Sequence, residues 1–198
     1  MSIQLGLLGK DISHSKSEEI YKSILGEKVQ YTLFDYPKND LIPSLSYFFD
    51  MVDGLSITAP YKMHFLNSLN LSPAAKDLQA VNCIKKEKEK FFGFNTDYMA
   101  FLELIKRKEL SNVNDFKIYL LGNGSMARVV ERAFYELNIE YLKIFRKQNF
   151  EINDFNFHDD LKNNNAFFIN ACSRGVVIRP NIDIKRINCF WDLNYGQD

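Results

Sequence analysis

The sequence predicts an α/β protein, because short apolar runs alternate with amphipathic stretches along nearly the whole chain. The runs expected to form strands span residues 3–8, 29–34, 54–57, 81–85, 91–94, 116–121, 141–145, 166–170 and 188–193. Helices are expected over residues 17–25, 41–49, 62–69 and 97–108, and from just after Ala127 to about residue 137. A polar break at residues 111–115 separates the two halves, so we expect domains at residues 1–111 and 112–198.

Composition and charge exclude several classes of protein. Of the 198 residues, 46% are hydrophobic, and 25 Lys and Arg residues are balanced by 25 Asp and Glu residues. This balance provides no basic surface for nucleic acid, and no apolar run approaches the length of a membrane span. No signal peptide is visible, and the separated residues Cys83, Cys172 and Cys189 have no metal-ligand spacing. We expect a soluble, cytoplasmic protein with free thiols and no bound metal.

The strand expected at residues 116–121 leads into a glycine-containing turn and then a helix. The turn reads Gly122-Asn123-Gly124-Ser125-Met126-Ala127, and all six residues are candidate cofactor contacts. In a dinucleotide site Gly122 would make the tight turn, Gly124 would admit the pyrophosphate, and Ala127 would allow close helix packing. The alternative is a turn that needs two glycines only for its own backbone. The second half is therefore predicted to be a reduced Rossmann-type domain.

The end of the next expected strand indicates which dinucleotide is bound. An NAD site commonly has Asp or Glu there, about 20 residues after the glycines, to bind the ribose 2′-hydroxyl. Here the strand is followed by Arg146 and Lys147, two cations suited to a 2′-phosphate. We therefore predict NADP(H), although two solvated charges at a strand end would also be compatible with NAD.

The segment Ser56-Ile57-Thr58-Ala59-Pro60-Tyr61-Lys62 delivers a hydroxyl and an amine to one place. Pro60 has no N–H and a fixed φ, so it is expected in the first turn of a helix. Thr58 would then end the strand, and Lys62 would lie at the positive end of the helix dipole. A cation tolerated in that position indicates a role in proton transfer.

Three further polar clusters lie at the ends of expected elements. Ser15 and Ser17 open the first helix, where their hydroxyls could hold a carboxylate or could simply cap the helix. Asn82 lies in an otherwise apolar strand, where a buried amide would need partners. Asp97 stands at the start of the helix expected over residues 97–108, where capping is the simplest explanation.

Taken in order, these segments resemble the shikimate dehydrogenase family. They are similar to its substrate-carboxylate loop and to its N-V-T-x-P-x-K, A-V-N-T, G-x-N-T-D, G-A-G-G-A, N-R-T, N-A-T-S-x-G and D-x-x-Y motifs. The matching segments are residues 9–17, 56–62, 80–82, 93–97, 122–127, 145–147, 170–175 and 192–195.

The resemblance implies an N-terminal α/β substrate domain, a Rossmann-type NADP-binding domain, and reversible reduction of 3-dehydroshikimate to shikimate. That reaction is a step towards chorismate and the aromatic amino acids. By the same resemblance, Lys62 and Asp97 would form the catalytic pair. The residues implied to bind substrate are Ser15, Ser17, Thr58, Asn82 and Tyr195, and Asn170, Ala171 and Cys172 would contact the cofactor.

The chain departs from the family pattern in three respects. Family members continue beyond D-x-x-Y with a final pair of helices that supply a glutamine, whereas this chain ends at Asp198. The stretch of residues 146–170 is short, and residues 10–11, 18 and 145 differ from the family pattern. A quinate or other cyclic hydroxy-acid dehydrogenase is one alternative, and a non-catalytic nucleotide- or metabolite-binding paralogue is another. A homodimer could cover sheet faces that a reduced domain exposes.

Overall fold

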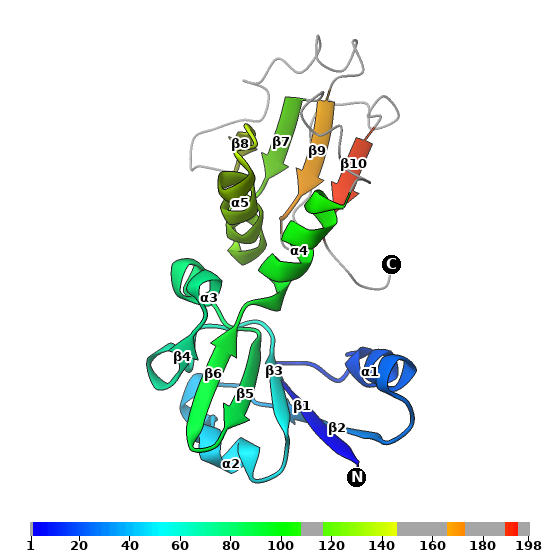
Figure 1. The fold of residues 1–198 in the computed structure, drawn as a ribbon, viewed down its shortest axis with the longest axis vertical. Helices are drawn as coiled ribbons and strands as arrows, with labels where there is room; N and C mark the ends of the chain where they lie inside the picture. The colour runs from blue at the N-terminus through cyan, green and yellow to red at the C-terminus, as the bar shows by residue number, and fades with distance from the viewer. Residues whose placement is uncertain (1, 108–116, 146–165, 173–188, 194–198) are drawn as a thin grey trace. The chain divides into compact units, whose positions relative to one another are not determined.

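A computed structural model of the chain describes residues 2–107, 117–145, 166–172 and 189–193. The chain divides into two compact units, Met1–Thr96 and Asp97–Asp198. Each unit has its own sheet with helices against it (Figure 1), which confirms the predicted α/β class. The domain boundary predicted between residues 111 and 112 lies outside the described residues and stays a prediction.

The first unit contains a six-stranded mixed sheet with the spatial order β2-β1-β3-β5-β6-β4. In that order the strands span Val29–Asp35, Ile3–Gly9, Gly54–Ile57, Cys83–Glu87, Lys90–Phe94 and Asn70–Leu71. β1 is parallel to β2 and β3, whereas β5 is antiparallel to β3 and β6. The short helix α2 (Leu45–Phe49) contributes Phe48, which is fully buried in one core with Leu8, Leu55 and Ile57.

The helix α1 spans Ser17–Leu25, the range that the sequence predicts. Its first turn carries Glu18 and Glu19, which favour the positive end of the helix dipole, and Glu18 pairs with Lys22 at 2.8 Å. α1 buries none of its residues fully. Its Tyr21 ring stacks on Tyr31 of β2, with the ring centroids 5.5 Å apart.

The helices of this unit differ from the prediction at two prolines, Pro43 and Pro73. The helix expected over residues 41–49 is only α2, because Ile42 precedes Pro43 and is extended, with φ −77° and ψ 122°. The sequence does not predict α3, Pro73–Leu78. Its start follows ordinary rules, since the Ser72 side chain accepts a hydrogen bond from the Ala75 N–H at 3.3 Å and Pro73 takes the first turn.

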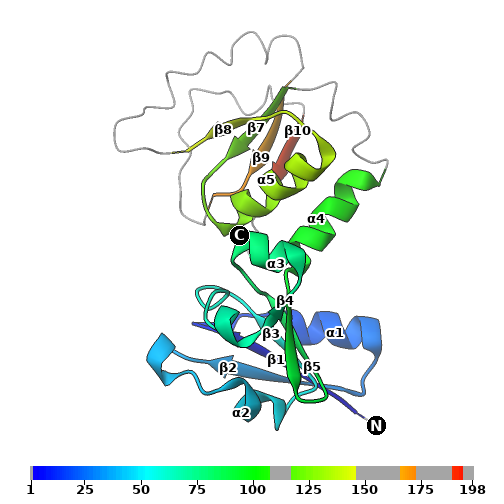
Figure 2. The same ribbon diagram turned by 60° about the vertical axis from the view of Figure 1, so that its left-hand side comes forward.

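The second unit contains a parallel sheet with the order β10-β9-β7-β8, formed by Cys189–Asp192, Ala166–Asn170, Lys117–Leu121 and Leu142–Ile144. The helix α5, Ser125–Leu137, follows β7 and lies against this sheet (Figure 2). It buries Ala127, Val130 and Phe134 at helical spacing. The chain passes from β7 to β8 on one side and later to β9 on the other. Strand order thus reverses at β7, as in a Rossmann-type sheet, and that prediction is confirmed.

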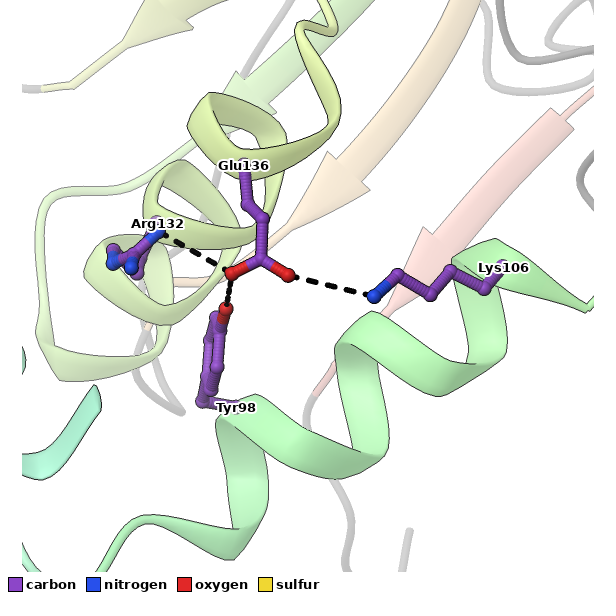
Figure 3. Close-up of polar contacts among 4 residues, drawn as sticks. All are labelled: Tyr98, Lys106, Arg132 and Glu136. Carbon is purple, nitrogen blue, oxygen red and sulfur yellow. Dashed lines mark hydrogen bonds and ion pairs between the residues drawn. The ribbon is translucent and has the colours of Figure 1, made fainter. Parts of the chain in front are cut away.

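The helix α4, Thr96–Lys106, packs on α5 through a cluster around Glu136 (Figure 3). The Tyr98 hydroxyl donates to Oε2 of Glu136, Lys106 Nζ lies 3.4 Å from Oε1, and Arg132 Nη1 lies 3.6 Å from Oε2. On the same helix, Phe101 stacks on Trp191 of β10 with centroids 5.3 Å apart. In the part of the chain that the structure describes, no helix is long and apolar enough to cross a membrane.

Candidate functional site

The predicted substrate residues of the first unit converge on one edge of its sheet. The register pairs Gly9 with Asp35, Leu8 with Ile57, and Ser56 with Cys83. Because β5 runs opposite to β3, its beginning lies beside the end of β3. The loop after β1, the turn after β3 and the residue before β5 therefore all lie at this edge.

The loop after β1 is held by the carboxylate of Asp35, the last residue of β2. The backbone N–H groups of Asp11 and Ile12 donate to its two oxygens at 2.9 and 3.0 Å. Asp11 has a φ of +54°, a conformation in which two successive N–H groups can turn towards one anion. Asp35 therefore orients the loop that carries the paired serines.

Ser15 and Ser17 form a close pair of half-buried hydroxyls at the end of this loop. The Ser15 hydroxyl donates to Ser17 Oγ at 3.0 Å, and the Ser17 N–H donates to Ser15 Oγ at 3.2 Å. The residue at the cap position of α1 is Lys16, whose side chain makes no capping hydrogen bond. Two adjacent hydroxyls at the start of a helix are suited to an anion.

Gly9 allows the loop to approach Thr58 closely. A Cβ atom at Gly9 would lie 2.6 Å from Thr58 Cγ2 and 2.4 Å from Ile12 Cγ2, both far inside normal contact distance. The Thr58 N–H donates to the Leu8 carbonyl at 2.9 Å. Thr58 and the serine loop are therefore neighbours, and a larger residue at position 9 would separate them.

The helix predicted over residues 62–69 is wrong. Residues 59–60 form a turn, in which the Ala59–Pro60 peptide bond is cis. The Tyr61 N–H donates to the Thr58 carbonyl at 2.9 Å, three residues back, and the only regular helical turn in the stretch is the 3₁₀ segment Leu66–Ser68. Tight three-residue turns replace the four-residue repeat of an α-helix.

Lys62 consequently does not lie at a helix N-terminus. Its carbonyl accepts a hydrogen bond from the Val81 N–H at 2.8 Å, so it is used by the neighbouring segment. The helix-dipole argument for an easily lost lysine proton is therefore removed. Lys62 is half-buried and lies in a turn, between Tyr61 and Phe65 in the sequence, and both of these rings are buried.

Asn82 fixes the start of α4. Its Oδ1 accepts from the Thr96 N–H at 2.7 Å and from the Thr96 hydroxyl at 3.0 Å. These two donors determine the orientation of the amide, so its NH₂ group faces away from Thr96. The fully buried amide of this region is Asn95, which donates to the Ala80 carbonyl at 3.1 Å, whereas Asn82 is half-buried.

In the second unit, Gly122 is required by its own backbone. Its φ is +114°, and a Cβ atom there would lie 2.9 Å from both the carbonyl carbon and oxygen of Ala171. Gly124 differs, because a Cβ atom at that position would meet no described protein atom within 4 Å. Ala127 is fully buried. Packing within the described residues therefore requires Gly122 and a small side chain at position 127, and it sets no such requirement at Gly124.

The end of β9 lies beside this turn, since the Ala171 N–H donates to the Leu121 carbonyl at 2.8 Å. Asn170 accepts the Cys172 N–H at 3.1 Å and donates to the Asp192 carboxylate at 3.2 Å. Burial, reinforced by the charge of Asp192, raises the pKa of the Cys172 thiol. The predicted residues Arg146, Lys147 and Tyr195 lie outside the described residues.

Sequence reasoning missed Asp35, which anchors the serine loop, and Tyr31, whose hydroxyl lies beside Ser17. An acidic residue at a strand end was the available signal for Asp35. Tyr31 gives no such signal, because an aromatic residue in a strand ordinarily indicates packing alone.

The sequence matches a family model and several known relatives. The model described as the shikimate dehydrogenase substrate binding domain matches residues 7–84. The shikimate dehydrogenase (NADP(+)) of Clostridium botulinum is 30% identical over 215 residues, which cover 96% of this chain and 81% of that protein. The chain belongs to the shikimate dehydrogenase family.

Solved structures agree with this assignment. A chorismate mutase/shikimate 5-dehydrogenase fusion protein from Clostridium acetobutylicum matches with a TM-score of 0.70 and 26% identity, covering 98% of this chain and 78% of that chain. The shikimate 5-dehydrogenase from Thermus thermophilus in complex with NADP(H) and shikimate has a TM-score of 0.63 and 25% identity, with 85% and 68% coverage. The family suggested by the sequence motifs is thereby confirmed.

Proposed function

We propose that this chain catalyses the reversible, NADP(H)-dependent reduction of 3-dehydroshikimate to shikimate, a step of aromatic amino-acid biosynthesis. The observation that carries the proposal is the Ser15 and Ser17 hydroxyl pair, held at the same sheet edge as Thr58 and Asn82. Such a pair suits the carboxylate of a cyclic hydroxy acid. A family relative was solved with NADP(H) and shikimate, which supports the same ligands here.

In this proposal the first unit binds the substrate. Ser15 and Ser17 donate hydrogen bonds to the carboxylate, and Thr58 and Asn82 contact the ring hydroxyls. The orientation of the Asn82 amide supports this role, because Thr96 occupies its Oδ1 and leaves the NH₂ group directed elsewhere. Tyr195 would supply a further hydroxyl, by its match to the family motif.

Lys62 and Asp97 would transfer the proton. The chemistry that bound NADP(H) supplies is hydride transfer at the carbon that bears the reacting oxygen. Oxidation of the alcohol then requires removal of the hydroxyl proton, and reduction of the ketone requires its return. The Lys62 amine can do both, and Asp97 would orient it. Asp97 directly follows Thr96, which Asn82 holds by two hydrogen bonds.

The second unit would bind the cofactor at the carboxyl ends of β7 and β9. Parallel sheets bind nucleotides where the strand order reverses, and this position is β7. The turn from Gly122 to Ala127 would face the pyrophosphate, and Asn170 to Cys172 would line the adjacent strand end. Arg146 and Lys147 would bind the 2′-phosphate and so select NADP over NAD.

The direct test follows NADPH absorbance with the purified chain and shikimate, repeated with quinate and with NAD. We expect turnover with shikimate and NADP. A preference for quinate would favour the related cyclic hydroxy-acid dehydrogenase, and NADP binding without turnover of either acid would favour a non-catalytic paralogue. Sedimentation equilibrium of the same sample tests the proposed homodimer.

A further inference from the structure

The hydroxyl of Tyr31 is buried without a hydrogen-bond partner among the described residues. Tyr31 lies on β2, and its ring stacks on Tyr21 of α1 at 5.5 Å, with 24° between the planes. A buried donor without a partner is costly and rare, so this hydroxyl calls for a physical explanation.

Two serine hydroxyls lie beside the Tyr31 hydroxyl. Burial raises the pKa of Tyr31, and the hydroxyls of Ser17 and Ser56 partly oppose that rise, although neither makes a hydrogen bond of normal geometry with the phenol. On α1, Ser17 and Tyr21 are four residues apart and so share one face of the helix, and Tyr21 stacks on Tyr31. The sheet register explains this grouping, since Tyr31 pairs with Leu5 and Ser56 pairs with Leu7 on the same strand β1. Residues paired in this way and two apart along β1 point to the same face. The register places the phenol on the same side of the sheet as Ser56, and the stacking on Tyr21 places it against the face of α1 that carries Ser17.

In the structure the serine pair can offer a carboxylate only one of its two hydroxyl protons. The Ser15 hydroxyl donates to Ser17 Oγ, so its proton is used within the pair and only that of Ser17 is available. A carboxylate has two oxygens and accepts hydrogen bonds from both serines only if Ser15 redirects its proton. Ser17 Oγ then loses its donor unless another group replaces it.

We propose that Tyr31 is a positioning residue of the substrate site, and that its hydroxyl donates to Ser17 Oγ when a carboxylate binds. This frees both serine protons for the anion and gives the orphan phenol proton an acceptor. The inference rests on the proposed function, because it assigns the serine pair to a carboxylate. Tyr31 acts through Ser17 and has no contact with the reacting atoms.

The first test is Tyr31→Phe, which keeps the ring and removes only the hydroxyl. We expect KM for shikimate to rise by up to about tenfold, the upper end of the net value of one neutral hydrogen bond, while kcat and KM for NADP stay within about twofold. The variant should fold, because no partner of the hydroxyl is left unsatisfied. Tyr47→Phe is the matched control in the same unit, at a side chain that is 49% exposed, and should change neither constant.

A double-mutant cycle shows which serine Tyr31 serves. In a Ser17→Ala background the added Tyr31→Phe change should have no effect on KM, whereas in a Ser56→Ala background it should still raise KM by up to about tenfold. Additivity with Ser17→Ala would overturn the inference. Loss of the effect with Ser56→Ala would also overturn it, since Tyr31 would then merely support the sheet.

Calorimetric binding of shikimate to the complete chain separates this inference from the proposed function. A wild-type chain that binds shikimate without turnover contradicts the proposed function, and weaker binding by Tyr31→Phe would still support the role of Tyr31. Equal binding by wild type and Tyr31→Phe would overturn the inference whatever the turnover. A fall in kcat at unchanged KM would also contradict a positioning role in carboxylate binding.

Discussion

The two sheet edges hold their polar loops by different physical means. In the first unit the loops are tied by side chains: Asp35 accepts two backbone N–H groups, and Asn82 accepts the N–H and hydroxyl of Thr96. In the second unit the position of the turn after β7 depends on glycine at position 122, because a Cβ atom there would clash with the backbone of Ala171. The loops of the first edge are held by side-chain hydrogen-bond acceptors, whereas the turn of the second edge requires a residue without a Cβ atom.

This difference predicts different responses to substitution. A side-chain acceptor can be replaced by an isosteric group at the cost of one hydrogen bond, so the expected loss is moderate and local. A Cβ atom added at Gly122 would lie only 2.9 Å from the backbone of Ala171, so the expected loss includes global stability. Four substitutions test the comparison, in decreasing order of expected effect.

The largest effect is expected for Lys62→Ala, which removes the proposed proton carrier of the first edge. We expect kcat to fall by about 10²–10⁴, the usual contribution of general acid–base catalysis, with the KM for NADP largely unchanged. Steady-state kinetics measures both constants. Lys76→Ala, at an exposed lysine of α3, is the control. A near-normal kcat for Lys62→Ala would remove this residue from the catalytic assignment.

Gly122→Ala tests the steric edge. We expect the free energy of unfolding to fall by about 2 kcal/mol, because alanine would be strained at a φ of +114° and would clash with Ala171. Gly124→Ala is the matched control, with stability within about 0.5 kcal/mol of wild type. Urea denaturation measures both. If Gly124→Ala nevertheless raises the KM for NADP, the cofactor approaches its backbone. Equal stability of all three proteins would contradict the steric argument.

Asp35→Asn tests the polar edge. The substitution keeps the shape but replaces one acceptor oxygen with a donor that faces a backbone N–H. We expect the KM for shikimate to rise about tenfold as the serine loop loses its orientation. Asp53→Asn is a matched control, because Asp53 accepts the Gln4 N–H at 2.8 Å at the opposite edge of the sheet. It should lower stability without changing KM, and equal changes of KM in both variants would contradict the anchoring role.

The smallest effect is expected for Glu136→Gln, because Glu136 belongs to the α4–α5 cluster and to neither set of polar loops. The Tyr98 hydroxyl, and then Lys106 and Arg132, lower the pKa of the Glu136 carboxyl below its ordinary value of 4.5. A lowered native pKa stabilises the fold above the unfolded-state pKa, and this contribution is lost as the pH falls through the native value. The stability advantage of wild type over Glu136→Gln should therefore shrink below about pH 4.5 in urea titrations. An advantage independent of pH would contradict the charge assignment.

Much of the fold was predictable because its signals are local. Apolar runs such as those of β3 and β9 predict their strands to the residue, and the Ser17–Leu25 helix follows from its acidic first turn and its end before Gly26. The segment after Pro60 was mispredicted, because a proline suits both a first helical turn and a tight turn. The structure has the tight turn, and the bond from the Val81 N–H to the Lys62 carbonyl, between residues distant in sequence, holds the segment in that form.

The sequence by itself determined the fold class, the glycine turn and the chemical groups of the two edges, since these depend on residue type and spacing. Tertiary structure alone decided which atoms hold those groups in place. Asp35 reaches the serine loop because β1 and β2 pair in register, and Tyr31 stacks on Tyr21 because α1 packs on β2. Such contacts cannot be predicted from the spacing of residues along the chain, because they form only when the strands pair.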